Sequence, residues 1–261
     1  MQRPAVKSFL AQACAGFALL LSAVPAAIAA PEEIQVYTYD VNEPGQFGIE
    51  LHSNYVIQGP RTSQYPGQTP TNHFFQVTPE FSYGIAKNWD VGLYVLTGRA
   101  ADGNLYGNGA KLRIKYVSAG ETGLFWGLNA EYGRTSQRVT EANANIELRP
   151  IIGWRNDVWL VSFNPIIGAA VSGNGSRQPS FSPAIKVARE IREGLQIGFE
   201  HYADMGAFQQ IPSFNQQEHT FYGVIDYEGK AFDINFGIGR AVTGGTPDKW
   251  VAKMIIGIPF K

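Results

Sequence analysis

Residues 75–85 read FQVTPEFSYGI, and this stretch decides how the chain folds. Its apolar members occupy every second position, from Phe75 and Val77 to Ile85, and polar residues or glycine fill the positions between them. Successive side chains of a β-strand point to opposite faces, so this period of two predicts a strand with one apolar and one polar face.

The same period recurs along most of the 261 residues. Twelve segments carry it, at residues 45–59, 73–86, 91–98, 107–117, 122–133, 142–154, 158–171, 180–189, 195–205, 218–227, 231–242 and 249–260. The connections between them alternate between long and short, and the long ones are rich in Gly, Pro, Ser, Gln and Asn. Short periplasmic turns and longer external loops are typical of an outer-membrane barrel. The sequence therefore predicts a closed, antiparallel, all-β transmembrane barrel of about 12 strands, with both termini at the short-turn side.

A soluble two-sheet sandwich is the alternative, because its apolar parity would face a common core. The distribution of aromatic residues favours the barrel, whose wall carries aromatic girdles at both membrane interfaces. Aromatic residues gather near the predicted short turns at Tyr83, Tyr116, Trp154, Trp159, Tyr227 and Phe232, and near the long loops at Tyr55, Phe75, Tyr132, Phe181 and Trp250.

The composition agrees with two dissimilar strand faces. Charged residues make up 16% of the chain and aromatic residues 13%, whereas a soluble domain carries ~25% charged residues. After the N-terminal segment, no stretch approaches the roughly 20 apolar residues of a transmembrane helix. The formal net charge of −1 argues against a nucleic-acid partner, which would require a basic surface.

The N-terminal segment has the pattern of a cleaved export signal. Arg3 and Lys7 precede an apolar run at residues 13–24, and Ala27-Ile-Ala29 forms a small-residue cleavage site. The apolar run is too short for a membrane anchor. We expect residues 1–29 to be a signal peptide, residues 30–44 a periplasmic extension or plug, and residues 45–261 the barrel. The single cysteine, Cys14, leaves with the signal peptide.

The last predicted strand ends on the outward parity at Phe260, one residue before the C-terminus. It resembles the terminal strand that the barrel-assembly machinery recognises in Gram-negative outer-membrane proteins, although those usually end on the aromatic residue itself. The expected location is the bacterial outer membrane, and the expected partners are its lipid, its lipopolysaccharide and the assembly machinery.

The polar parity of the strands lines the predicted lumen. Its candidate pore residues are Glu50, Glu80, Lys111, Arg113, Lys115, Asn129, Glu131, Glu147, Arg149, Lys186, Glu200, Asp226, Asp233 and Lys253. Turn positions predict that Lys111, Asn129 and Glu147 lie in one row, and that Arg113, Gly127 and Arg149 lie in the next. Two interpretations stay open: paired charges that close a narrow barrel, or a selective pore that steers a solute.

Apolar residues also occupy the lumen parity, whereas open porins have a polar interior. They are Phe74, Tyr94, Phe125, Ile151, Ile166, Tyr202, Tyr222 and Ile255. This mixture fits either a plugged interior or a path for small apolar or aromatic molecules.

Signals for catalysis are weak. The four histidines lack the spacing of a metal site, so we expect no metal and no cofactor. Barrel enzymes of the outer membrane place a serine–histidine pair on the lipid face. His201 has that parity, but no serine of the same parity lies on a neighbouring predicted strand, so no enzymatic activity is expected.

Residues 77–95, VTPEFSYGIAKNWDVGLYV, and residues 109–116, GAKLRIKY, carry a family resemblance. They resemble proteobacterial barrels of the meta-pathway phenol-degradation-like transporter group, in which a P-E-x-x-Y-G strand, a turn with Trp and a G-L-Y strand precede a basic strand. The resemblance covers about 40 residues and implies an outer-membrane barrel that passes hydrophobic or aromatic compounds. The resulting expectation is a passive channel or uptake protein for small molecules. The alternatives are a structural or plugged barrel and, third, a lipid-modifying enzyme.

Overall fold

The computed structural model describes residues 33–175 and 177–259. The predicted signal peptide and Phe260 lie outside these residues. The strand segments are β1 (Phe47–Gln58), β2 (Phe75–Ala86), β3 (Trp89–Arg99), β4 (Leu105–Ser118), β5 (Gly123–Thr135), β6 (Ala142–Arg155), β7 (Trp159–Asn164), β8 (Ile167–Gly173), β9 (Ser180–Phe181), β10 (Ala184–Arg192), β11 (Leu195–Asp204), β12 (Glu218–Glu228), β13 (Asp233–Ala241) and β14 (Trp250–Pro259).

Two of the twelve predicted strands are each divided by a proline. Pro165 separates β7 from β8, and Pro183 separates β9 from β10. Proline has no N–H to donate to a β-ladder, so the ladder is interrupted at these positions. β7 and β8 both pair with β6, and on their other side β7 pairs with β10 and β8 pairs with β9, so each divided strand continues past its proline. The described residues therefore form the twelve strands that the alternation predicts.

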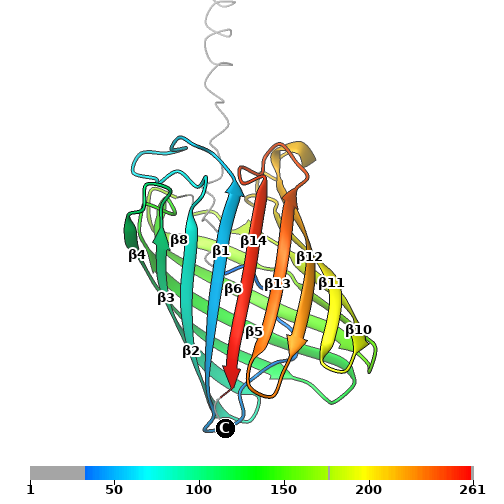
Figure 1. Cartoon of the computed structure of the whole chain (residues 1–261). Coiled ribbons are helices and arrows are strands. Elements are labelled where there is room, and N and C mark those ends of the chain that lie inside the picture. The colour runs from blue at the N-terminus through cyan, green and yellow to red at the C-terminus, as the bar shows by residue number, and fades with distance from the viewer. Residues whose placement is uncertain (1–32, 176, 260–261) are drawn as a thin grey trace, which may run out of the picture.

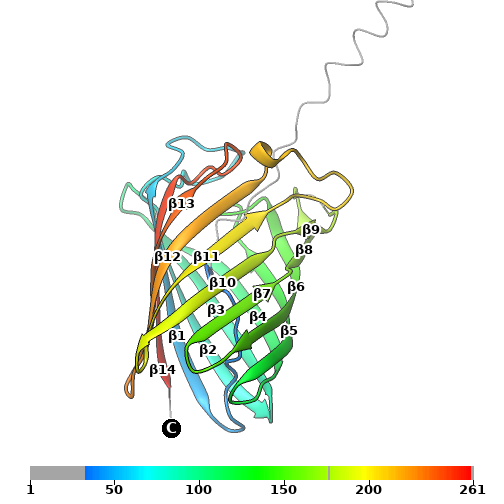
Figure 2. The same cartoon turned by 90° about the vertical axis from the view of Figure 1, so that its right-hand side faces the viewer.

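The sheet closes on itself. Consecutive strands pair antiparallel around the barrel, β5 pairs with β6, and β1 pairs with β14 over Gly48–Val56 and Val251–Pro259 (Figures 1 and 2). Inside a bilayer no water is present to satisfy an open sheet edge, so closure is the condition for a strand to cross.

Short and long connections lie at opposite ends of the barrel. The short turns are residues 87–88, 119–122, 156–158, 193–194 and 229–232, at the lower end in Figure 1 together with the C-terminal end of β14. The long loops, including residues 59–74 and 205–217, lie at the other end. From the loop lengths, we expect the lower end to face the periplasm.

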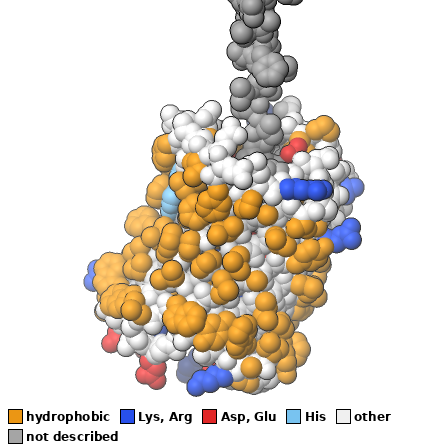
Figure 3. All heavy atoms as spheres, turned by 180° about the vertical axis from the view of Figure 1, so that it is seen from behind, with side chains coloured by type: hydrophobic (Ala, Val, Ile, Leu, Met, Phe, Trp, Pro, Cys, Tyr) orange, Lys and Arg blue, Asp and Glu red, His pale blue; other side chains and the backbone are white. Residues whose placement is uncertain are grey.

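The outward parity forms an apolar wall. Side chains such as Leu112, Trp126 and Phe236 are exposed on it, and Figure 3 shows hydrophobic atoms over the middle of one face with most of the charged groups near its two ends. Aromatic residues that the sequence assigns to the girdles are also exposed, among them Tyr83, Trp154, Trp159, Tyr227 and Phe232 near the short turns and Tyr55, Phe75, Tyr132 and Trp250 near the long loops. This is the surface that lipid requires.

The predicted lumen rows are wrong in register. Arg113 pairs with Glu131, which pairs with Glu147, and in the next row Lys115 pairs with Asn129, which pairs with Arg149. The hairpin between β4 and β5 is centred near residue 122, where Gly123 adopts a φ of 97°, rather than near residue 120 as the predicted turn placed it. Moving the centre of a hairpin by two residues shifts every cross-strand partner by four.

Within the described residues, no helix is long and apolar enough to cross a membrane.

Substitutions at two strand glycines can test how the lumen side chains pack against the wall. A Cβ on Gly153 would lie 2.1 Å from the ring of Phe125 and 2.4 Å from the carbonyl oxygen of Val161, whereas a Cβ on Gly223 meets nothing within 4 Å. We expect Gly153→Ala to lower the free energy of unfolding by about 1–3 kcal/mol. Gly223→Ala, the matched control, should change it by less than about 0.5 kcal/mol. Urea unfolding in detergent micelles measures both, and equal midpoints would contradict the packing described.

Candidate functional site: the barrel lumen

All fourteen lumen residues predicted from the sequence lie on the inward parity of their strands. Buried members are Glu80, Arg113, Asn129, Glu131, Arg149, Lys186, Glu200 and Lys253. Partly exposed members are Glu50, Lys111, Lys115, Glu147, Asp226 and Asp233. The apolar residues predicted for this parity are also buried, at Phe74, Tyr94, Phe125, Ile151, Ile166, Tyr222 and Ile255, and Tyr202 is partly buried.

One ion-pair cluster is centred on Arg113 of β4. Its guanidinium donates to Glu80, with Nε 2.6 Å from Oε1, and to Asp90. His52 Nε2 lies 3.2 Å from the other oxygen of Glu80, and Lys115 Nζ lies 3.7 Å from Asp90. A buried charge requires a partner, and this network gives one to each of these groups.

A second cluster joins β10, β11, β12 and β14. Glu200 forms one ion pair with the ammonium of Lys253 and a second, at 3.4 Å, with the ammonium of Lys186. Lys186 also donates to Asp226 at 2.7 Å, and the hydroxyl of Tyr202 donates to Glu200 at 2.6 Å. The cluster links four strands through side chains, in addition to the backbone ladder.

A third group lies on β4, β5 and β6. Arg149 Nε donates to Glu147 at 2.8 Å, and Asn129 donates to Glu131 at 2.7 Å. Lys111 Nζ lies 3.8 Å from Glu131. Opposite charges therefore alternate on the wall, as the interpretation of paired charges predicts.

Residues 33–44 run inside this charged wall and form no strand (Figures 1 and 2). Their upper part lies at mid-barrel, where Lys253 donates to the carbonyl oxygen of Ile34 at 3.0 Å and Arg149 to that of Gln35 at 3.2 Å. Their lower part lies near the short turns, where Asn42 donates to Ser82 at 2.8 Å. The segment thus descends through the lumen to the start of β1.

Tyr37 is the most strongly held residue of the segment. Its N–H donates to Asn164 Oδ1 at 2.7 Å, and its carbonyl oxygen accepts from Ser162 Oγ at 2.6 Å. Its hydroxyl lies 2.7 Å from that of Tyr94 and donates to Glu131 at 3.2 Å. The guanidinium carbon of Arg149 lies 4.3 Å from the centre of its ring, the geometry of a cation–π contact.

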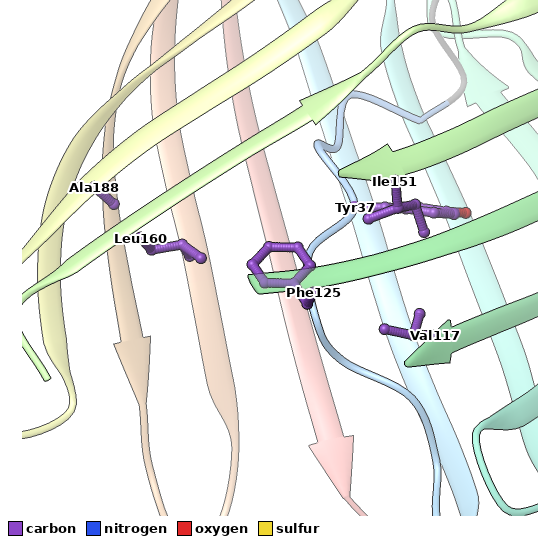
Figure 4. Packing of buried hydrophobic residues seen from close by; sticks show 6 residues of the cluster. All are labelled: Tyr37, Val117, Phe125, Ile151, Leu160 and Ala188. Atoms are coloured by element: carbon purple, nitrogen blue, oxygen red, sulfur yellow. The ribbon is translucent and has the colours of Figure 1, made fainter. Parts of the chain in front are cut away.

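The same ring belongs to an apolar cluster on one side of the lumen. It comprises Tyr37, Val117, Phe125, Ile151, Leu160 and Ala188 (Figure 4). A separate apolar cluster surrounds Ile34 and includes Tyr222 and Val224. The lumen therefore offers apolar surface between its charged networks.

Several residues of these networks are absent from the predicted lumen set, among them Asp90, His52 and Asn164. Asp90 was excluded because the expected strand began at residue 91, whereas β3 begins at Trp89; extending the alternation by two residues would have found it. His52 has the lumen parity beside Glu50 but was judged only for metal spacing. Apart from its position before Pro165, nothing in the sequence indicates a role for Asn164, because its partner is the backbone of Tyr37, which is distant in sequence.

The external mouth contains a small cavity of about 70 Å³. Its lining includes Gln64, Gln68, Thr71, Glu218, Tyr222 and Asp248. Burial raises the pKa of the Asp248 carboxyl above its usual value, while the hydrogen bond from Thr71 and the charge of Lys249 oppose the rise.

Glu50, His52 and Glu80 bring three ligand atoms within 4.8 Å of one another. Glu80 is already bound by Arg113, and His52 Nε2 lies 3.4 Å from Glu50 and 3.2 Å from Glu80. The guanidinium binds Oε1 of Glu80, next to the Oε2 that faces His52, and its positive charge would repel a cation there, so we assign no metal to this group.

His201, the lipid-facing histidine considered for catalysis, is paired with another histidine. Its Nε2 lies 3.0 Å from His219 Nδ1, and its ring stacks on Phe221 with centroids 4.3 Å apart. Among the described residues no serine hydrogen-bonds either histidine ring. The absence of enzymatic activity stays a prediction.

The sequence matches no known family model and no curated protein. Several solved structures have a similar fold, including the following three. The COG4313 outer membrane channel from Pseudomonas putida F1 has a TM-score of 0.58 at 11% identity, over 87% of this chain and 100% of that chain. The KdgM porin has 0.56 at 10% identity, and the NanC porin 0.55 at 11%, each over 82% of this chain and 99% of its own. The fold is that of a Gram-negative outer-membrane barrel.

The Arg113 network gives a direct test of the buried ion pairs. Arg113→Met leaves Glu80 and Asp90 buried without their main partner, so we expect a loss of about 3–5 kcal/mol in the free energy of unfolding. The double variant with Glu80→Gln should recover more than about 1 kcal/mol, which a double-mutant cycle measures by urea unfolding in micelles. The exposed Arg134→Met is the control, with a change within about 0.5 kcal/mol. Additive losses in the cycle would contradict the pairing.

Proposed function

We propose that the chain is a passive outer-membrane channel for the uptake of small molecules, and that residues 33–44 form a plug that moves before a solute passes. The observation that carries the proposal is the segment's mode of attachment. It makes no β-ladder with the wall and is held by separate hydrogen bonds from side chains such as Lys253, Asn164 and Ser162. Each such bond contributes a net of about 0.5–1.5 kcal/mol, more where the donor is charged.

The wall behind the plug supports a water-filled path once the plug has moved. Glu80 pairs with Arg113, and Glu200 pairs with Lys186; all four residues belong to the barrel wall. Movement of the plug therefore leaves these ion pairs intact. Charges of both signs around the path favour neither anions nor cations strongly. Channels and porins among the similar solved structures add support at the level of the fold.

Small aromatic or apolar molecules are the solutes we favour. Apolar side chains such as Phe125, Ile151 and Tyr222 are buried in the lumen beside the charged groups, and an aromatic solute would replace the contacts of the Tyr37 ring. The resemblance of residues 77–95 and 109–116 to the meta-pathway phenol-degradation-like transporters supports the same class. The fourteen residues of the lumen wall would line its path.

We also propose how the chain is processed and inserted into the membrane. Cleavage near Ala29 would leave residues 30–44 ahead of the barrel, and the strand that ends at Phe260 would direct insertion by the barrel-assembly machinery. The finished barrel would lie in the outer membrane among phospholipid and lipopolysaccharide.

A permanently closed barrel is the second candidate. The burial of Tyr37 and its contacts with Tyr94, Glu131, Asn164 and Ser162 favour it, because a plug fixed this firmly also serves as an interior core.

Liposome swelling separates the two. We expect liposomes with the refolded mature protein to swell faster in benzoate than in a sugar of similar mass, and Tyr37→Ala to raise the rate several-fold because it releases the plug at its centre. The matched control is Tyr39→Ala in the same segment, because Tyr39 makes none of the hydrogen bonds of Tyr37. The Tyr39 hydroxyl donates to Glu228, and its ring contacts Arg155 and Phe125. Without swelling in either solute by wild type or Tyr37→Ala, the channel is excluded and the closed barrel stands.

A further inference from the structure

Three adjacent strands place an aromatic pair and an arginine in one row on the outer wall. Tyr55 of β1 pairs with Phe75 of β2, and Phe75 pairs with Arg99 of β3. All three side chains are exposed on the outward parity. Because β2 begins and β3 ends in this row, it lies at the long-loop end of the wall, where the external membrane interface is expected.

A β-bulge places His73 beside the row. The N–H of Val56 donates to the carbonyl oxygen of Phe74 at 3.0 Å, and the N–H of His73 donates to the carbonyl oxygen of Val56 at 2.9 Å, so two residues oppose one. His73 has a φ of 60°, a conformation that glycine adopts without strain and histidine rarely does. Backbone strain of this kind clusters at functional sites, which suggests that the imidazole has a role in addition to completing the turn.

The imidazole is held over Tyr55. His73 Nδ1 lies 2.9 Å from the Tyr55 hydroxyl, and the two rings stack with centroids 6.0 Å apart. Phe75 meets Tyr55 edge to face, with centroids 6.4 Å apart. These rings and Arg99 line an open hollow of about 330 Å³ together with Ala100 and Ala101. We call this hollow the rim site.

Among residues 33–175 and 177–259, no carboxylate lies within ion-pair distance of the Arg99 guanidinium. Arg99, the Tyr55 hydroxyl and the His73 imidazole together present several hydrogen-bond donors at the membrane interface. Below the row, the wall continues in exposed apolar side chains, including Leu51, Phe81 and Leu93.

We propose that the rim site binds a phosphate group of the phosphorylated glycolipid in the outer leaflet. The planar fork of Arg99 binds two phosphate oxygens, and the Tyr55 hydroxyl or the His73 ring donates to a third. The acyl chains lie below, along Phe75 and the apolar wall. Charge complementarity selects an anion, and the outward position at the lipid interface selects a lipid rather than a solute in the lumen.

The strained histidine fits this assignment. A glycine would satisfy the bulge at no conformational cost, but only a side chain fixes the Tyr55 ring by stacking and by the hydrogen bond. His73 therefore acts as a positioning residue for the hydroxyl, and it presents its second ring nitrogen at the surface.

Binding of bis-phosphorylated lipid A to the refolded mature protein, followed by native mass spectrometry from detergent, tests the proposal. We expect Arg99→Gln to weaken binding about tenfold, the loss of one charge-assisted contact pair. The matched control is Arg134→Gln, because Arg134 is also exposed on the outward parity at the long-loop end, but its cross-strand neighbours are Ala110 and Ala144. The control should bind as wild type does.

Two further ligands and one further variant complete the test. Dephosphorylated lipid A should bind at least tenfold more weakly than the phosphorylated form, and inorganic phosphate alone should fail to compete. His73→Asn keeps the left-handed backbone, which asparagine tolerates. It should keep the heat-modifiable gel shift of the folded barrel while weakening lipid A binding about threefold. Equal losses in Arg99→Gln and Arg134→Gln, equal binding of the dephosphorylated lipid, or equal binding of free phosphate would each overturn the proposal.

Discussion

The need to pair every backbone N–H and C=O group without water governs this structure. Lipid offers no hydrogen-bond partner, so the sheet has to close, and the pairing of β1 with β14 achieves it. Closure fixes an inside and an outside for every strand. The period of two then sends apolar side chains to lipid and polar ones to the lumen, and the interruptions at Pro165 and Pro183 occur where the ladder loses a donor.

Closure also creates an interior in which charges have to be satisfied. Arg113 with Glu80 and Asp90, and Glu200 with Lys186 and Lys253, meet this need from the wall. Residues 33–44 add backbone acceptors and the ring of Tyr37 to the same networks. The lumen is thus filled by a segment that the wall holds through both polar contacts and apolar packing.

Alternation along each strand was enough to predict the twelve strands, the closed fold, the outward aromatic residues and the inward set of charges. It was not enough for the register, because a hairpin centred near residue 122 instead of residue 120 changes the partner of Arg113 from Gly127 to Glu131. Nor did it decide the course of residues 33–44, whose run from Ile34 to Tyr39 also fits an early part of the first strand but forms no strand in the structure. Their partners, such as Asn164 and Ser162, lie more than 120 residues away in sequence, so only the folded barrel brings them together.

The central claim is that the N-terminal segment controls passage through the lumen. Single-channel recording in planar bilayers tests it most directly, with the refolded mature protein and a variant that lacks residues 30–41. A segment that blocks the lumen should give small, infrequent steps in the mature protein and larger, sustained conductance in the shortened one, with the heat-modifiable gel shift of a folded barrel in both. Identical conductance of the two folded proteins would contradict it.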